Sequence, residues 1–358
     1  MTFDTLTSLG RRSTKFVASC NGAALHAVAL LIAASACGSG AVDVGTLPNP
    51  DDGGDDPVGS AGSAGTSSGP DAGGGPDPVS QCSIPGLERH RLVFDSDEGQ
   101  LERRIYSMRA DGSEVVPITS AGVLAREPAM SPDGNVLAYA TAEGIELLDV
   151  NAESTDLFAP FHEQPAWSPD GLRLAASYLG GITILDRMND MDARDVSCGG
   201  NFCPFVAWSM DGSEIIYTDE GVSSDGSLYL MNALELETGA GRAIVPKSAI
   251  RAVQPTASPD GVWLAAAYDC PGDDNSSLWL SQYAISTPAC EGRRVTPPNA
   301  PAVTNPSWGP GVLIAYERGE PPRDIAIIAA DTGEECVIEM PGDQRNPSWM
   351  PESTFEPK

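Results

Sequence analysis

The sequence predicts an all-β fold, a six-bladed β-propeller closed by pairing of the C-terminal strand into the N-terminal blade. One short motif recurs along the chain. Its central position falls at Met130, Trp167, Trp208, Ala257, Trp308 and Trp349, in steps of 37, 41, 49, 51 and 41 residues. A period of this length is typical of propellers and solenoids. No stretch between the copies has the pattern of an amphipathic helix, which favours a propeller over a helical solenoid.

Each repeat begins with a short strand and a tight turn. In the copy QPAWSPDGLRLAASY, which starts at Gln164, Pro169 presets the backbone angle of the turn and Asp170-Gly171 favours the conformations that close it. The segment 174–178 that follows is apolar with little alternation, as expected of a strand covered on both faces. The motif therefore predicts the first two strands of a blade.

The Asp and Trp side chains that recur in the motif admit two interpretations. Carboxylates could serve acid–base chemistry or metal binding, and tryptophans could stack on sugars. Their regular place in each copy favours turn formation for the carboxylates and packing between blades for the tryptophans. The residues concerned are Asp133, Asp170, Asp211 and Asp260, and Trp167, Trp208, Trp308 and Trp349.

A third strand follows in every repeat, with β-branched, aromatic and polar residues alternating at period two. These strands are RIYSMRAD from Arg104, GIELLDV from Gly144, GITILDR from Gly181, SLYLMNA from Ser227, SLWLSQY from Ser277 and DIAIIAAD from Asp324. Turns at Asp111-Gly112 and Thr332-Gly333 lead into a fourth strand such as VVPIT or CVIEM. Each repeat thus supplies the four strands of a blade.

The two ends of the repeat array complete one another. The array opens at RLVFDSD, from Arg91, as a second strand, and it ends at NPSWMP, from Asn346, as a first strand without a second. Together the two fragments make a whole blade, which gives six blades in a closed ring. Closure removes the sheet edges that would otherwise template aggregation.

The phrase PAWSPDG, followed by a strand, an IYxM strand and a DG turn, resembles the WD-like repeat of the TolB-type β-propeller. The resemblance covers about residues 88–350, and it departs at Trp308-Gly309-Pro310-Gly311, where the turn has lost its Asp. TolB itself carries a separate N-terminal α/β domain, for which residues 38–85 are too few and too polar. The resemblance therefore implies the fold but not a role in the Tol system.

The N-terminal region predicts export. Arg11, Arg12 and Lys15 precede an apolar run over 16–36 that ends in small residues, so we expect a signal peptide at 1–36; a membrane-spanning helix and a twin-arginine signal are the alternatives. Cys37 resembles the lipidated cysteine of bacterial lipoproteins. Residues 37–85 read as the lipid attachment and a disordered Gly/Ser/Pro/Asp tether, 86–351 as the propeller and 352–358 as a tail. We therefore expect an outer-membrane lipoprotein that faces the periplasm or the cell surface.

The cysteines beyond Cys37 predict disulfides. Six remain, an even number in an exported chain. The nearest pair is Cys198 with Cys203, Cys270 with Cys290 would close the next loop, and Cys82 with Cys336 follows only by elimination. Because there is no CxxC pair and only His90 and His162 lie outside the signal, the sequence speaks against zinc and haem.

The charge excludes some partners. Formal net charge is -29, and it is -31 once residues 1–36 are removed, so nucleic acid and anionic membranes are poor partners. Two acidic stretches, 189–195 and 269–275, are either solvated loops or weak calcium sites, the second through Asp269, Asp273 and Asp274. We therefore expect no cofactor apart from possible calcium.

No catalytic motif of a hydrolase, metalloprotease or nucleotide-binding enzyme is present, so no catalytic residue is predicted. In a propeller, residues at the start of each first strand crowd the mouth of the central channel. Here the predicted mouth consists of Arg126, Glu127, Glu163, Gln164, Arg251, Gln254, Asn305, Arg345 and Asn346, which either bind a ligand or simply solvate the rim. We expect a monomeric, non-catalytic scaffold for an envelope protein or peptide; the alternative is a carbohydrate-active or carbohydrate-binding propeller with its site in the channel.

Overall fold

The computed structural model describes residues 79–80, 82–98, 102–188, 193–196, 203, 205–223, 226–248 and 250–351. The predicted signal peptide, Cys37 and most of the tether lie outside these ranges. Apart from one turn of 3-10 helix, η1 (Leu87–Arg89), the described elements are strands. None of the described segments forms a helix long and apolar enough to cross a bilayer.

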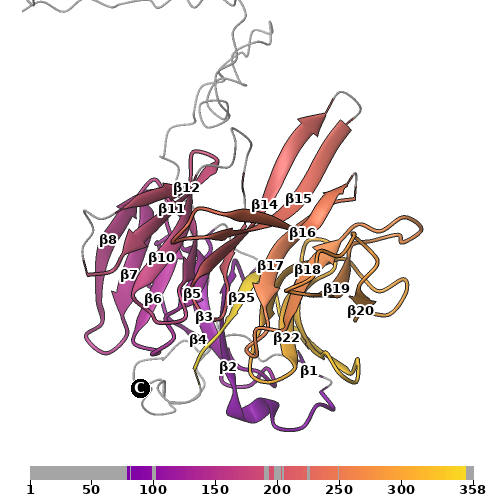
Figure 1. Ribbon diagram of the computed structural model, residues 1–358. Helices are drawn as coiled ribbons and strands as arrows, with labels where there is room; N and C mark the ends of the chain where they lie inside the picture. Colours follow the sequence, from indigo (N-terminus) through magenta and orange to yellow (C-terminus); the bar gives the residue numbers. More distant parts are fainter. Residues whose placement is uncertain are drawn as a thin grey trace, which may run out of the picture. The chain divides into compact units, whose positions relative to one another are not determined.

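The strands form six antiparallel sheets, which confirms the predicted all-β propeller (Figure 1). Blade 1 contains β25 (Gln344–Trp349), β2 (Arg91–Ser96), β3 (Arg104–Arg109) and β4 (Val116–Pro117), and blade 2 contains β5 (Arg126–Met130), β6 (Val136–Ala140), β7 (Gly144–Asp149) and β8 (Ser154–Pro160). Blade 3 contains β9 (Glu163–Trp167), β10 (Arg173–Tyr178), β11 (Gly181–Asp186) and β12 (Arg194–Val196).

The other three blades follow the same order. Blade 4 contains β13 (Val206–Trp208), β14 (Glu214–Ser223), β15 (Gly226–Glu235) and β16 (Gly241–Ser248), and blade 5 contains β17 (Ala252–Ala257), β18 (Trp263–Tyr268), β19 (Ser277–Gln282) and β20 (Arg293–Arg294). Blade 6 contains β21 (Val303–Trp308), β22 (Leu313–Arg318), β23 (Asp324–Ala329) and β24 (Glu335–Glu339), with β1 (Val79–Ser80) as a fifth strand. The hairpin of β14 and β15 is the long one in Figure 1, with ten residues in each strand.

The ring closes as the sequence predicts. Strand β25 pairs antiparallel with β2, with Leu92 opposite Trp349 and Asp95 opposite Arg345. The first strands of successive blades contact one another in turn, and β25 contacts both β21 and β5. The C-terminal strand therefore completes the N-terminal blade.

The second strands are covered on both faces, as their unbroken apolar runs predict. Strand β6 is buried throughout, and β18 and β22 are buried at all but one position. Cores form between blades: Leu92, Phe94 and Tyr106 of blade 1 pack with Ala315 and Ile327 of blade 6. Burial of this kind is the dominant favourable term in folding and holds the blades face to face.

The Asp side chains of the motif lie in the turns between first and second strands. The hydroxyl of Ser168 donates to Asp170 over 2.5 Å, and the same carboxylate oxygen accepts the N–H of Leu172 at 3.0 Å. Asp133, Asp211 and Asp260 make the equivalent bonds in their own turns. These carboxylates have the turn-forming role predicted for them.

The tryptophans of the motif lie between blades. The indole N–H of Trp208 donates to the carbonyl of Ala166 at 2.9 Å, and Trp167 and Trp349 make the same bond to the preceding blade. Trp308 instead donates within its own turn, to Gly311. A Cβ at Gly309 would lie 2.2 Å from the Trp349 ring, so the close approach of this ring requires Gly where four other copies have Ser. That contact accounts for the Gly of the blade 6 motif, and nothing in the structure explains its missing Asp.

Some residues of the segment 37–85, which the sequence assigns to the tether, contact blade 6. Strand β1 pairs with β24, Ile84 is buried, and Cys82 forms a disulfide with Cys336. The composition of the segment favours a tether, but the disulfide and the strand pairing fix its last residues on blade 6. Cys270 is bonded to Cys290 as anticipated. The third predicted pair includes Cys198, which lies outside the described ranges.

Candidate functional site: the central channel

A cavity of about 780 Å³ lies among the first strands of all six blades. Its walls include residues 127–130 of β5, 164–167 of β9, 206–208 of β13, 254–257 of β17, 304–307 of β21 and 345–348 of β25. The cavity is therefore the central channel of the propeller. One end is polar and lies where the chain begins each first strand. The other end is apolar and lies at the turns between first and second strands.

The polar end is built by one residue from each blade, which we call the bulge residues. They are Glu127, Gln164, Phe205, Gln254, Asn305 and Asn346, and all have φ between 47° and 65°. This left-handed conformation is uncommon for residues other than glycine and carries strain, most of all for a bulky side chain such as Phe205. A shift of strand register accompanies it in five blades. Because this conformation recurs in all six blades, it is part of the blade architecture.

The bulge residues link neighbouring blades by hydrogen bonds. The Glu127 carboxylate accepts the backbone N–H of Gln164 at 2.8 Å, and the Gln164 side-chain oxygen accepts the N–H of Phe205 at 3.2 Å. Gln254 likewise accepts the N–H of Asn305 at 2.7 Å, and Asn305 donates to the Asn346 side chain at 2.8 Å. These bonds satisfy the amides that the bulges turn away from their own sheets.

Phe205 interrupts this series between blades 4 and 5, because its side chain has no atom that can accept a hydrogen bond. The next charged residue along the channel is Arg251, which is exposed. Within the described ranges its guanidinium makes no hydrogen bond or ion pair, whereas Arg323 and Arg345 on the same channel are paired with carboxylates. The series of inter-blade hydrogen bonds is therefore interrupted near Arg251, whose positive charge is available to a ligand.

A buried charge network lies where blade 1 meets blade 6. Asp95, which is fully buried, binds Arg103, and Arg103 also binds Asp343 at 2.7 Å. Asp343 further pairs with Arg345 and Arg323. Burial alone would raise the pKa of Asp343, but the N–H of Arg323 and the neighbouring guanidinium groups lower it to about 2. Arg323 and Arg345 are therefore both engaged in ion pairs, although the Arg345 side chain is 40% exposed.

Glu127 is a carboxyl group of the polar end whose titration is strongly shifted. Its side chain is 20% exposed, and burial raises its pKa to about 7. The Gln164 N–H and Arg126 act in the opposite direction, while the carboxylates of Glu163 and Asp95 add to the rise. Ionisation of Glu127 therefore costs stability as pH increases from the range of an unfolded Glu through neutrality.

We expect Glu127→Gln to stabilise the protein at pH 8 by about 2 kcal/mol and to leave its stability nearly unchanged at pH 4, below the pKa of an unfolded Glu. Gln already occupies the equivalent position in blades 3 and 5, where it accepts the same inter-blade N–H. Thermal unfolding at the two pH values measures the effect, with the exposed neighbour Glu163→Gln as the control. A pH-independent difference between Glu127→Gln and wild type would contradict the prediction.

The structure places the predicted mouth residues in different environments. Gln164, Arg251, Gln254, Asn305 and Arg345 line the channel, as do Glu127 and Asn346. Arg126 and Glu163 pair with each other at 2.5 Å and do not contribute to its wall. Most of the set thus faces the cavity, but the polar groups of Gln164, Gln254 and Asn305 are engaged within the protein.

Three polar residues of this end were missed by sequence reasoning, namely Asp95, Glu317 and Arg323. Glu317 accepts the N–H of Asn346 at 2.9 Å, and Arg323 lies 3.4 Å from Glu317. They come from β2, β22 and the turn after β22, whereas the prediction considered first strands only. A charged residue near the end of an otherwise apolar strand, as in RLVFDS and LIAYER, is the signal that could have found two of them.

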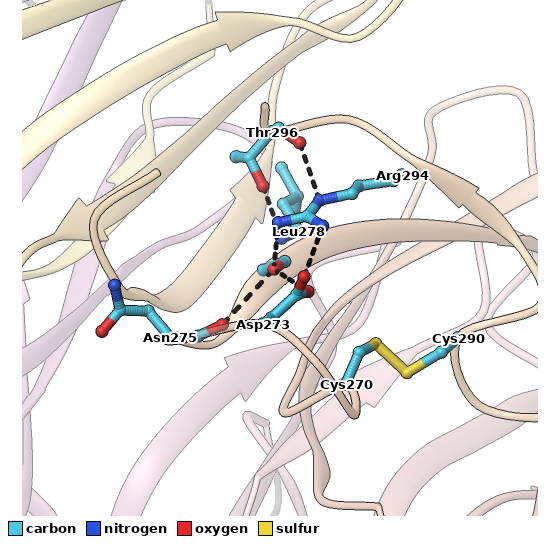
Figure 2. Close-up of a disulfide and its surroundings, with 8 residues drawn as sticks. Cys270, Asp273, Asn275, Leu278, Cys290, Arg294 and Thr296 are labelled. Carbon is cyan, nitrogen blue, oxygen red and sulfur yellow. Dashed lines mark hydrogen bonds and ion pairs between the residues drawn. A yellow bond between two sulfur atoms is a disulfide. The ribbon is translucent and has the colours of Figure 1, made fainter. Parts of the chain in front are cut away.

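The acidic loop 269–275 is held by an arginine. Asp273 pairs with Arg294 at 2.7 Å and accepts a hydrogen bond from the Ser277 hydroxyl, next to the Cys270–Cys290 disulfide (Figure 2). Over the ranges that the structure describes, no three His, Cys, Asp or Glu side chains come together as a metal site would need. Asp273 is thus engaged in an ion pair, and calcium binding through Asp269, Asp273 and Asp274 stays a prediction. Residues 189–192 of the other acidic stretch lie outside the described ranges.

No protein-family model and no curated protein matches the sequence. Among solved structures, TolB from Acinetobacter baumannii is similar over 75% of this chain and 68% of that chain, with a TM-score of 0.62 and 20% identity. A putative TolB from Agrobacterium tumefaciens is similar over 72% and 92%, with a TM-score of 0.56 and 18% identity. A chain of a nidogen/laminin complex is similar over 74% and 99%, with a TM-score of 0.57 and 13% identity. In fold, the chain is therefore a six-bladed β-propeller of the TolB type.

Proposed function

We propose that the protein is a non-catalytic binding scaffold of the bacterial envelope, which receives an acidic segment of a partner protein at the polar end of its channel. The observation that carries this proposal is the open cavity with Arg251 at its edge. The other arginines there are committed to Asp343 and Glu317, so Arg251 is the group with charge to offer. A carboxylate on this guanidinium would form a charge-assisted hydrogen bond.

The chemistry of the cavity supports binding without catalysis. Among the described residues of its wall there is no histidine or cysteine, and its amide side chains are engaged in links between blades. A similar propeller was solved in a nidogen/laminin complex, which is a precedent for protein partners in this architecture. Fold alone does not decide function, so the proposal depends on the site.

The sequence and the disulfides support the proposed location. Two disulfides are typical of exported proteins, which supports export. We propose that Cys37 carries a lipid in the outer membrane and that a tether leads from it to the monomeric body fixed at Cys82. This arrangement would let the propeller reach partners at a distance from the membrane surface.

Charge reversal at Arg251 tests the binding role. We expect Arg251→Glu to reduce recovery of the partner from envelope extracts by roughly tenfold or more, since a repulsive charge replaces an attractive one. The matched control is Arg89→Glu, which makes the same change at a side chain that is 81% exposed and outside the channel wall. Quantitative mass spectrometry of the captured proteins measures both. Equal losses in the two variants, or none in either, would contradict a site at Arg251.

A further inference from the structure

The apolar end of the channel is bordered by four consecutive turns, which we call the turn rim: residues 131–134, 168–171, 209–212 and 258–261. Adjacent turns touch. A Cβ on Gly171 would lie 3.6 Å from Pro132, one on Gly212 3.6 Å from Pro169, and one on Gly261 3.7 Å from Met210. The turn rim is therefore a continuous surface across blades 2 to 5.

Apolar side chains are exposed along this rim. Leu172 is 52% exposed, Met210 40% and Val262 48%. Inside the rim the channel wall continues with Met130, Trp167 and Trp208. A run of exposed apolar side chains that leads into an apolar cavity is typical of an interaction surface.

The same turns carry negative charge. Hydrogen bonds from Ser209 and Ser213 lower the pKa of Asp211 to about 2, and that from Ser258 lowers the pKa of Asp260, so both are ionised at neutral pH. Two arginines lie nearby: Arg173 is 4.7 Å from the Trp208 ring and 3.8 Å from Asp170, and Arg187 is 3.7 Å from Asp133. Within the described ranges neither Asp211 nor Asp260 has an ion pair.

The two ends of the channel therefore differ in charge. Arg251 provides a free cation at the polar end, whereas the turn rim combines Asp211 and Asp260 with the apolar side chains of Met210 and Val262. Long-range charge of this kind selects partners of opposite sign. Anionic membranes and acidic segments are disfavoured at the turn rim for the same reason.

We propose that the turn rim is a second binding surface, which docks a basic peptide segment and holds its apolar side chains against Leu172, Met210 and Val262. Lysine or arginine side chains of the segment would lie at Asp211 and Asp260. Apolar burial would supply most of the affinity, and the carboxylates would set the sign of the charge that is accepted. This site is separate from the one proposed at Arg251, so either can fail alone.

Fluorescence anisotropy with the full-length protein tests the proposal, using three labelled ten-residue peptides: alternating Leu-Lys, alternating Leu-Glu, and all Lys. We expect the Leu-Lys peptide to bind at roughly 0.3 M salt, where screening should release the all-Lys peptide, and we expect the Leu-Glu peptide not to bind. The triple variant L172S/M210S/V262S should weaken Leu-Lys binding at least about tenfold, in line with the loss of apolar contacts from three side chains.

Matched variants locate the effect. Leu179→Ser removes a side chain that is 81% exposed and follows the far end of β10, and it should leave binding unchanged. D211N/D260N should weaken binding at low salt more than D269N/D274N, a pair outside the turn rim. Arg251→Glu should have no effect on the Leu-Lys peptide. Unchanged binding by the triple variant with an unaltered melt, or equal losses in the rim variants and their controls, would overturn the proposal.

Discussion

Deletion of residues 345–350 should unfold the protein or convert it to oligomers. The deletion removes nearly all of β25, so β2 keeps only β3 as a partner and blade 1 loses its innermost strand. It also removes Trp349, which packs against the core between blades 1 and 6. An unpaired edge beside an opened core exposes backbone groups and apolar surface that pair readily with another chain.

Circular dichroism melts and size-exclusion chromatography measure this result. The control is a chain that ends at residue 351, which keeps β25 and removes only the predicted tail. We expect that control to melt like the full chain. A monomeric Δ345–350 protein with an unchanged melting temperature would show that closure by β25 does not hold the ring together.

Asp95→Ala should lower the free energy of unfolding by about 3 to 5 kcal/mol, the usual cost of removing one partner of a buried ion pair. Arg103 would be left without its fully buried partner, and two further donors would lose their acceptor: the N–H of Glu127 at 3.0 Å and the Asn346 amide at 2.6 Å. These groups belong to the junction of blades 1 and 2 with the closing strand. The substitution therefore removes stabilising contacts at the place where the C-terminal strand closes the ring.

Urea denaturation at pH 7 measures this change. Asp156→Ala on the exposed strand β8 is the control and should shift stability by no more than about 0.5 kcal/mol. Asp95→Asn keeps an oxygen that can accept from Glu127, so its loss should be smaller than that of Asp95→Ala. Equal effects of Asp95→Ala and Asp156→Ala would contradict a structural role for the buried charge.

The polar end of the channel shows why a residue that faces a cavity is not always a ligand-binding residue. Gln164 faces the channel, yet its side-chain oxygen accepts from Phe205 and from the Ser177 hydroxyl. Substituting it would disturb the link between blades 3 and 4 before it affected a ligand. Arg251 is the better choice for a functional test because its charge is not used elsewhere in the described structure.

The sequence by itself determined the repeat, the turns, the order of strands and the closure of the ring. These features depend on local chemistry: Pro169 and Gly171 fit only a tight turn, and the apolar run 174–178 requires burial on both faces. The strand count at the two ends then allows one way to complete the last blade. The repeat in the sequence also placed Gln254, Asn305 and Arg345 on the channel wall, because the position of a residue in the repeat fixes its position in the blade.

Only the tertiary structure decided which of those polar groups are free. Arg345 and Arg323 pair with Asp343, which lies outside the repeat motif, and Arg323 also pairs with Glu317. Asp95 reaches Asn346 across 251 residues of sequence. The pairing of Arg126 with Glu163 and the fixing of Cys82 to Cys336 are likewise contacts between distant segments. Hydrogen bonds and ion pairs depend on distances of about 3 Å, and repeat periodicity does not specify distances between side chains of different blades.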